Sequence, residues 1–167
     1  MSAASPVTIL PATAENAPGL AALIRAAFEE YRGKLDPPSG GLTETPEGLI
    51  RDMAKGGALV AWNGSEPAGC VLYCAEPDHL YWYRLAVSPA LRRQGIARAL
   101  VQAVEDLARA RGYQQARVSV RLVHAGTRAF YASLGYGFLS LGAHPGSSQP
   151  TYATLAKALG GQRLSPS

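Results

Sequence analysis

The sequence predicts a mixed α/β or α+β domain, in which strands gather in the middle of the chain and helices are interspersed. Three observations carry this prediction. The chain has 167 residues, an ordinary length for one domain. Of these residues 47% are hydrophobic and 17% are charged, which supplies enough apolar material for a core. Apolar residues recur at helical spacing in some segments and alternate or run together in others, in the order β-α-α-β-β-β-α-β-α-β-β.

The first third of the chain is predicted to hold one strand and two helices. Residues 7–10 are short and β-branched, which favours a strand. Residues 34–45 contain two prolines and two glycines and are predicted to be a loop long enough to be functional. A second helix begins with Pro46 at its first position and runs to about Lys55. A first helix is predicted over 14–32, because apolar residues recur there at helical spacing, at Leu20, Leu23, Ile24, Ala27 and Phe28.

The middle of the chain is predicted to form three strands and then the clearest helix. The apolar runs 58–62 and 68–75 form a hairpin around the turn Asn63-Gly64, and 79–87 is the third strand. The helix covers 94–111. Its apolar face consists of Ile96, Leu100, Ala103, Val104 and Leu107. Its opposite, polar face consists of Arg98, Gln102, Glu105 and Arg109.

The last part of the chain is predicted to continue as a strand, a helix and two strands. The first strand covers 117–122, where apolar and polar residues alternate strictly. The helix covers 127–134, and the last two strands cover 136–141 and 151–155. We therefore expect a single domain over residues 1–159, with no internal repeat, followed by a disordered tail over 160–167.

Charge and cysteine usage narrow the classes of function. The formal net charge is +4, and nine of the 16 cationic residues lie between Arg84 and Arg128. Such a cluster fits nucleic acid, an anionic surface or a polyanionic cofactor. Arginines and aromatic residues do not interleave as a base-stacking platform requires, so nucleic acid is not expected. Cys70 and Cys74 lie roughly 13 Å apart on a strand, too far for a disulfide or a shared metal ion. No metal is expected.

The sequence also indicates where the protein acts. No apolar run approaches the roughly 18 residues of a membrane-spanning helix, and we expect no membrane association. The N-terminus has no basic start, and Glu15 interrupts the apolar stretch that follows, so no signal peptide is predicted. The expected location is the cytoplasm.

The strongest chemical signal is the turn between the strand 79–87 and the helix 94–111. The first turn of a helix has unpaired N–H groups and a partial positive charge, which together favour an anion. Gly95 allows a ligand to approach the backbone, and Arg92, Arg93 and Arg98 surround the same point. A phosphate-bearing ligand explains this pattern, and so does a basic first turn of an ordinary surface helix. The motifs of nucleoside-triphosphate P-loops and of dinucleotide folds are both missing.

Two motifs resemble those of the GNAT superfamily of N-acetyltransferases. The segment Leu85-Ala86-Val87-Ser88-Pro89, followed by Arg92-x-x-Gly95-x-Ala97, is similar to its acyl-CoA motif. The segment Phe130-Tyr131-Ala132-Ser133-Leu134-Gly135-Tyr136 is similar to its second signature. The resemblance covers residues 7–159. It implies a mostly antiparallel central sheet flanked by about four helices, with a splayed strand pair around the CoA site.

The resemblance also implies an activity and a set of site residues. The activity is transfer of an acetyl or other acyl group from acetyl-CoA to a primary amine of a small molecule or peptide, without an acyl-enzyme. Tyr131 would lie near the sulfur and protonate the leaving thiolate, although an aromatic at this position also fits plain packing. The implied cofactor contacts are the pantetheine arm on Leu85, Ala86 and Val87, the pyrophosphate on the backbone of Arg93, Gln94, Gly95, Ile96 and Ala97, and charge screening by Arg92, Arg93 and Arg98.

The sequence departs from the family pattern at two positions. Tyr81 stands where some members carry a glutamate base, and a tyrosine with a pKa near 10 is a poor base at neutral pH. The base stays open between a water chain and the side chains of Glu76, Asp78 and His79. His124 stands where the family often has asparagine. It could bind CoA, cap the helix or face solvent.

The acceptor side is less determined. The resemblance assigns it to residues 28–47 and 142–152, where Glu29, Glu30, Asp36 and Glu44 either attract a cationic amine or are plain surface carboxylates. A CoA-binding regulatory module that has lost catalysis is an alternative reading, because the glutamate base is missing. The sequence names neither the acceptor nor the acyl chain, and a homodimer is compatible with it.

Overall fold

The computed structural model describes residues 6–160, so the predicted tail lies outside the described residues from position 161 onward. The described chain forms two compact units. The first contains the residues up to Cys74 together with Trp82–Val104, and the second contains Ala75–Tyr81 and the residues from Glu105 onward. The expectation of one domain over residues 1–159 stays a prediction.

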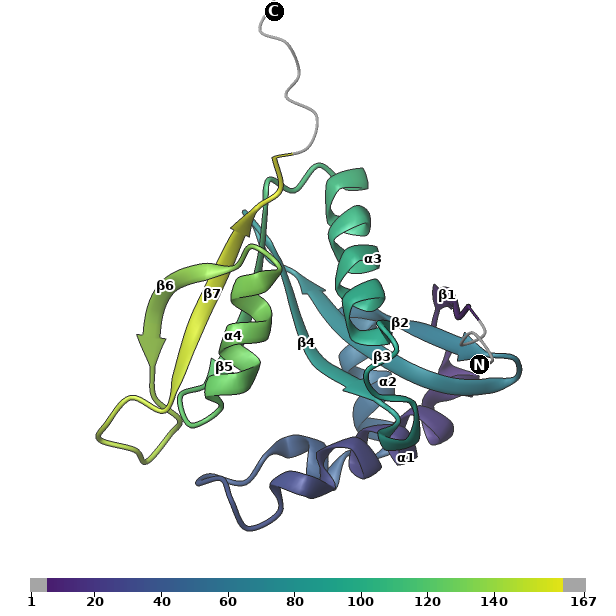
Figure 1. Cartoon of the computed structure of the whole chain (residues 1–167), viewed down its shortest axis with the longest axis horizontal. Helices are drawn as coiled ribbons and strands as arrows, with labels where there is room; N and C mark the ends of the chain where they lie inside the picture. Colours follow the sequence, from purple (N-terminus) through teal and green to yellow (C-terminus); the bar gives the residue numbers. More distant parts are fainter. Residues whose placement is uncertain (1–5, 161–167) are drawn as a thin grey trace, which may run out of the picture. The chain divides into compact units, whose positions relative to one another are not determined.

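The order of elements confirms the predicted mixed α/β class, and the strands form one sheet of seven in the order β1-β2-β3-β4-β5-β7-β6. Figure 1 labels the main elements. The strands are β1 (Thr8–Pro11), β2 (Gly56–Asn63), β3 (Glu66–Ala75), β4 (Leu80–Val87), β5 (Gln115–Arg121), β6 (Gly137–Gly142) and β7 (Tyr152–Ala158). The α-helices are α1 (Ala17–Phe28), α2 (Pro46–Ala54), α3 (Ile96–Ala110) and α4 (Ala125–Ser133). Short 3-10 turns are η1 (Ala14–Asn16), η2 (Glu29–Tyr31), η3 (Gly40–Thr43) and η4 (Pro89–Leu91).

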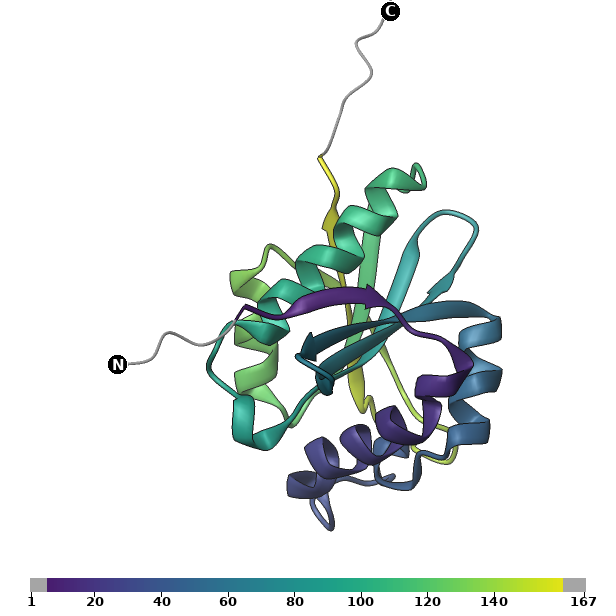
Figure 2. The same cartoon turned by 90° about the vertical axis from the view of Figure 1, so that its right-hand side faces the viewer.

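Helices cover both faces of the sheet in the first unit. Residues of α1 and α2 pack with Ala58, Val60, Cys70 and Leu72 of the β2–β3 hairpin in one apolar core. The start of α3 lies on the opposite face, as Figures 1 and 2 show. There Gly69 of β3 leaves no room for a side chain, because a Cβ would lie 2.9 Å from the Ala86 oxygen and 3.1 Å from side-chain atoms of α3. This close approach fixes where α3 begins relative to β4.

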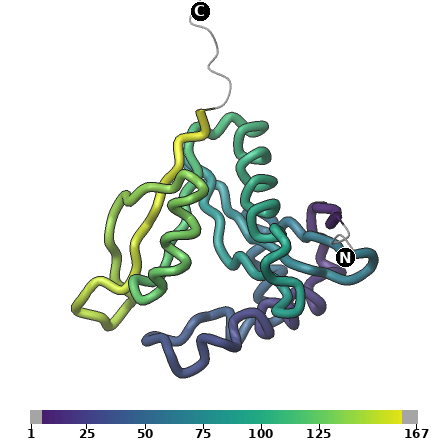
Figure 3. The backbone as a smooth tube through the Cα atoms, in the orientation of Figure 1, coloured from purple at the N-terminus to yellow at the C-terminus, as the bar shows by residue number. Residues whose placement is uncertain are grey.

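The segment between α1 and α2 is more structured than the sequence predicted. The predicted helix over 14–32 is α1 with a 3-10 turn at each end, and the predicted loop over 34–45 contains the turn η3. Figure 3 follows its backbone. Gly41 and Leu42 of η3 are buried. The start of α2 is as predicted, since the Gly48 N–H donates to the Thr45 hydroxyl at 3.0 Å and Pro46 occupies the first turn.

The second unit contains the end of the sheet. β5 pairs antiparallel with β7 along its whole length, and β7 pairs with β6. Buried Ala116, Val118 and Val120 alternate with less buried residues, which confirms the predicted alternation of β5. The parallel pairing of β4 with β5 covers only Leu80 with Ala116 and Tyr81 with Arg117. This short register is what a splayed strand pair requires.

The polar face predicted for the helix 94–111 was wrong at one residue. Glu105 is 1% exposed. The Tyr136 hydroxyl donates to its Oε2 at 2.8 Å, and the Lys157 ammonium donates to its Oε1 at 2.9 Å. Helical spacing alone indicates which face a residue lies on, not which distant side chains will cover it. Partners that are 31 and 52 residues away in sequence make burial of this carboxylate possible.

We expect Glu105→Ala to lower the free energy of unfolding by about 3 kcal/mol, because it leaves the Lys157 ammonium and the Tyr136 hydroxyl without their shared acceptor. Urea denaturation measures the change. The matched control is Asp106→Ala at the next residue, whose side chain is 63% exposed. It should change stability by less than about 0.5 kcal/mol. Equal small effects in both variants would contradict a stabilising role for the Glu105 cluster.

Candidate active site

The turn that precedes α3 has the backbone geometry of an anion site. Arg93 has φ +64° and Gly95 has φ +81°, both in the left-handed region. The first backbone hydrogen bond of α3 runs from the Ala99 N–H to the Gly95 oxygen at 3.0 Å. The N–H groups of the first helical turn therefore have no helical acceptor. A Cβ on Gly95 would meet nothing within 4 Å, so the space in front of the turn is open. The arrangement can hold a phosphate on backbone N–H groups.

The predicted cofactor residues of the first unit lie along one short path. Leu85, Ala86 and Val87 end β4, and the Ser88 N–H donates to the Ala68 oxygen of β3 at 2.8 Å. Ile96 is 5% exposed and anchors the start of α3 in the core. The exposed residues of the path are Arg92, Arg93, Gln94, Gly95 and Arg98, and Ala97 is half-buried.

One arginine of this turn already has protein partners. Nη1 of Arg92 donates to Glu30 Oε2 at 2.6 Å, and its Nη2 donates to the Ala27 oxygen at 2.9 Å. The bond from Arg92 lowers the pKa of Glu30 against the opposing effect of burial. Arg92 thus ties the turn to the end of α1. Its predicted contact with the cofactor stays a prediction.

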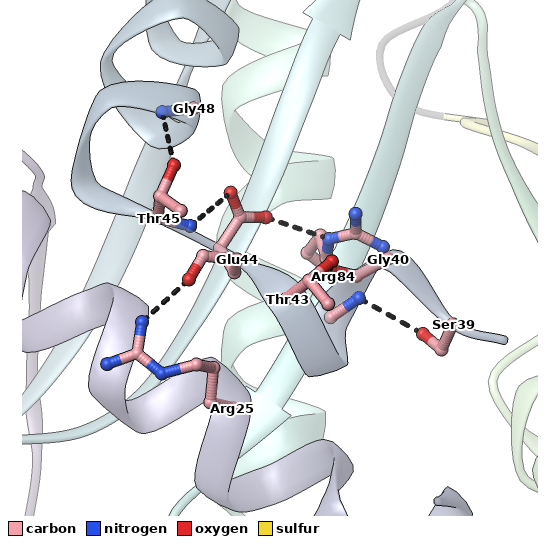
Figure 4. Close-up of polar contacts among 9 residues, drawn as sticks. Arg25, Ser39, Gly40, Thr43, Glu44, Thr45, Gly48 and Arg84 are labelled. Carbon is pink, nitrogen blue, oxygen red and sulfur yellow. Dashed lines mark hydrogen bonds and ion pairs between the residues drawn. The ribbon is translucent and has the colours of Figure 1, made fainter. Parts of the chain in front are cut away.

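An ion pair that the sequence analysis missed links β4 to the α1–α2 segment. Arg84 lies inside β4 with φ +54°, a conformation that costs a non-glycine residue roughly 1–3 kcal/mol. Its Nε donates to Glu44 Oε2 at 3.1 Å, and the Glu44 side chain is only 6% exposed (Figure 4). Glu44, which had been open between an acceptor contact and a surface carboxylate, is therefore neither exposed nor isolated. The signal in the sequence was a single charge inside the apolar strand 80–87.

The residues considered for a general base belong to the second unit. Nδ1 of His79 lies 2.7 Å from Asp78 Oδ1, and the His79 side chain is 14% exposed. The hydrogen bond from His79 holds the pKa of Asp78 below its usual range, and Arg117 acts in the same direction. A carboxylate on Nδ1 leaves Nε2 as the basic nitrogen. His79 thus has an oriented partner, and the general base stays open between a water chain, Glu76, Asp78 and His79.

His124 and Tyr131 both lie on α4. His124 occupies the N-cap position, and its side chain makes no capping hydrogen bond, so the capping alternative is excluded. Tyr131 is 8% exposed, and its ring lies 5.9 Å from that of Phe130. The backbone carbonyl oxygen of Tyr131 accepts from the N–H groups of Leu134 and Tyr136, and these bonds end the helix before Gly135.

The connection between β6 and β7 brings His144 against Thr151 and Tyr152. Nδ1 of His144 lies 2.5 Å from the Thr151 hydroxyl, and its ring meets the edge of Tyr152 at 5.2 Å. Burial lowers the pKa of His144, and the charge of Arg121 lowers it further. Both effects favour the neutral form of the His144 imidazole.

The two cysteines are free, and burial raises the pKa of Cys70 to about 12, so this thiol is unreactive at neutral pH. Among the residues that the structure describes, no group of three or more His, Cys, Asp or Glu side chains could hold a metal ion. Within residues 6–160, none of the helices is long and apolar enough to cross a membrane.

Comparisons with known proteins agree with this fold. The sequence model described as "Acetyltransferase (GNAT) family" matches residues 20–136. The PaiA N-acetyltransferase from Thermoplasma acidophilum, in complex with coenzyme A, is similar with a TM-score of 0.75 and 16% identity over 92% of this chain and 99% of that one. The ribosomal-protein-S18-alanine N-acetyltransferase from Escherichia coli has a TM-score of 0.75 and 18% identity over 96% and 99%. A search of curated proteins found no match.

The matched residues include β4, the turn before α3 and the second signature on α4. They cover well over half of the chain. The protein therefore belongs to the GNAT family of acetyltransferases, whose members are acyltransferases that use acyl-CoA. The two similar structures share its fold.

Proposed function

We propose that this protein is an N-acetyltransferase that moves the acetyl group of acetyl-CoA to a primary amine of a small molecule or peptide. The observation that carries the proposal is the turn before α3, a 15-residue helix, where Arg93 and Gly95 are left-handed and the space beside Gly95 is open. This geometry suits the pyrophosphate of CoA. A similar structure that is described as a complex with coenzyme A supports the same cofactor.

The reaction follows from the family chemistry. The uncharged amine nitrogen attacks the thioester carbonyl carbon and gives up one proton to the general base or to solvent. The C–S bond breaks, and CoA leaves as a thiolate that takes up one proton. No acyl-enzyme forms. The backbone of Leu85–Val87 would hold the pantetheine arm, with the Val87 N–H stabilising the oxyanion. Tyr131 would supply the proton to the thiolate.

We expect acetyl-CoA to raise the melting temperature of the protein, because a ligand that binds only the native state stabilises it. At 100 times the dissociation constant this amounts to about 2.7 kcal/mol. NAD and ATP at the same concentration should have much smaller effects, since the chain lacks the motifs that bind them. Thermal denaturation measures the three shifts. Absence of a shift with acetyl-CoA at millimolar concentration would refute the assignment.

Turnover requires a second measurement. Pooled amines and N-terminal peptides are incubated with acetyl-CoA while the release of free thiol is followed. Amine-dependent thiol release supports the transferase. A clear thermal shift without release on any amine would instead identify a CoA-binding protein without catalysis.

A further inference from the structure

The Arg84 guanidinium is held in one orientation. Its backbone adopts φ +54° within β4, and its Nε donates to Glu44 Oε2 at 3.1 Å. Glu44 is itself fixed, because its Oε1 accepts from the Thr45 N–H at 3.3 Å. A buried carboxylate that is bonded on both oxygens cannot turn freely, so it sets the plane of the guanidinium (Figure 4).

The outer edge of this guanidinium has no protein acceptor. Among residues 6–160, Glu44 is the only hydrogen-bond partner seen for the Arg84 side chain, and this bond uses Nε and neither Nη atom. The described chain has no polar side-chain atom that is buried without a partner, so both Nη atoms reach solvent. Two parallel N–H donors in one plane match the two oxygens of a carboxylate.

The local charge favours an anion at this edge. Nη1 of Arg25 donates to the Glu44 backbone oxygen at 2.6 Å, so a second guanidinium lies at this residue without binding its carboxylate. The three side chains carry a formal net charge of +1. A second carboxylate would complete the balance.

Gly40 allows the guanidinium to lie against the backbone of η3, because it has no side chain. A side chain there would collide with Nη2 of Arg84, and Gly40 is exposed. Gly40 begins η3, which lies in the segment that the sequence assigned to the acceptor side. Arg84 is three residues before Val87 on the same strand, roughly 10 Å along β4. That separation suits an acceptor of the size of an amino acid or a short peptide.

We propose that the outer edge of the Arg84 guanidinium, oriented by Glu44, binds a carboxylate of the acceptor. The acceptor class is then an amine that carries a carboxylate, namely an amino acid or a short peptide. The inference rests on the proposed acetyltransferase function and makes it more specific. Glu44 acts as a positioning residue, and Gly40 gives the guanidinium its place beside η3.

A purely structural role for the Arg84–Glu44 pair makes a different prediction. A clamp that only holds β4 and η3 together would, when broken, lower the activity on every acceptor in the same proportion. A carboxylate site lowers the activity on acids alone. The ratio of kcat/KM for an acid to kcat/KM for its amide therefore separates the two roles. An amino acid and its amide differ in the basicity of their amine. This difference is the same for every variant, so it cancels when the ratio is compared between variants.

The experiment measures acetyl-CoA-dependent thiol release with each amino acid and a set of dipeptides, against their C-terminal amides. We expect wild type to prefer the acids. In Arg84→Gln the acid-to-amide ratio should fall by roughly 10²-fold, because a charge-assisted bidentate contact is lost. Arg84→Lys keeps the positive charge beside Glu44 but loses the two parallel N–H donors. In this variant the acid-to-amide ratio should fall by less than in Arg84→Gln. The control Arg117→Gln removes an arginine of nearly the same exposure, 25% against 26% for Arg84, and should leave the ratio unchanged.

Three outcomes overturn the inference. A ratio that is the same in wild type and both Arg84 variants identifies a clamp. Thiol release with neutral amines but not with acids excludes a carboxylate site, while the acetyltransferase assignment stands. If acetyl-CoA neither stabilises the protein nor is consumed with any amine, the proposed function has failed and the inference with it.

Discussion

The Gly95→Glu protein is expected to lose at least roughly 10²-fold in affinity for acetyl-CoA. The new carboxylate would stand in the open space before the turn, where the pyrophosphate is proposed to bind. A like charge about 4 Å away in a partly exposed site costs up to about 4 kcal/mol, and ~2.7 kcal/mol corresponds to 10²-fold. Titration calorimetry or the thermal shift with acetyl-CoA measures the loss.

The matched control for this variant lies at the other end of the same helix. Gly112 has φ +85° and, like Gly95 at φ +81°, has nothing within 4 Å of an added Cβ. Both substitutions therefore impose the same backbone strain, roughly 1–2 kcal/mol. Gly112→Glu should lose stability and keep its affinity for acetyl-CoA. Equal affinity in the two folded variants would show that the cofactor phosphates bind elsewhere.

Tyr131→Phe is expected to lower kcat by roughly 10²-fold while the affinity for acetyl-CoA changes little. The substitution keeps the ring, which is 8% exposed, and removes only the proton that the proposed mechanism gives to the thiolate. Loss of a group that acts only in the transition state lowers kcat without weakening ground-state binding. Steady-state kinetics on one acceptor, together with the melting temperature, separate the two effects.

Tyr136→Phe serves as the structural reference for Tyr131→Phe. Tyr136 is 4% exposed, and its hydroxyl donates to the buried Glu105. We expect this variant to lose about 1–2 kcal/mol of stability, since a hydrogen bond to a charged group is removed, and to retain its kcat. A kcat for Tyr131→Phe as high as that for Tyr136→Phe would remove Tyr131 from the mechanism and leave solvent as the proton donor. The family assignment would be unaffected.

Local patterns were enough to predict much of this protein. The order of the elements, the alternation of β5 and the start of α2 depend on neighbours within a few residues, and the structure agrees with each. The turn at Arg92–Ala97 was predicted for the same reason. A glycine and arginines at the start of a helix favour an anion there because of the unpaired N–H groups of that helix, without any distant residue. The family followed from two such local motifs.

Contacts between distant residues could not be predicted in this way. Glu105 was predicted to lie on a polar face, but Tyr136 and Lys157 make its burial possible. Glu44 was left open between an acceptor contact and a plain surface carboxylate, but it pairs with Arg84, 40 residues away. Arg84 has a left-handed backbone that a strand pattern does not reveal. The sequence by itself determined which elements form, and it predicted the turn before α3 as the site of a polyanion. Only the tertiary structure decided which charges are paired and buried, because the energy of a buried charge depends on partners that folding brings from elsewhere in the chain.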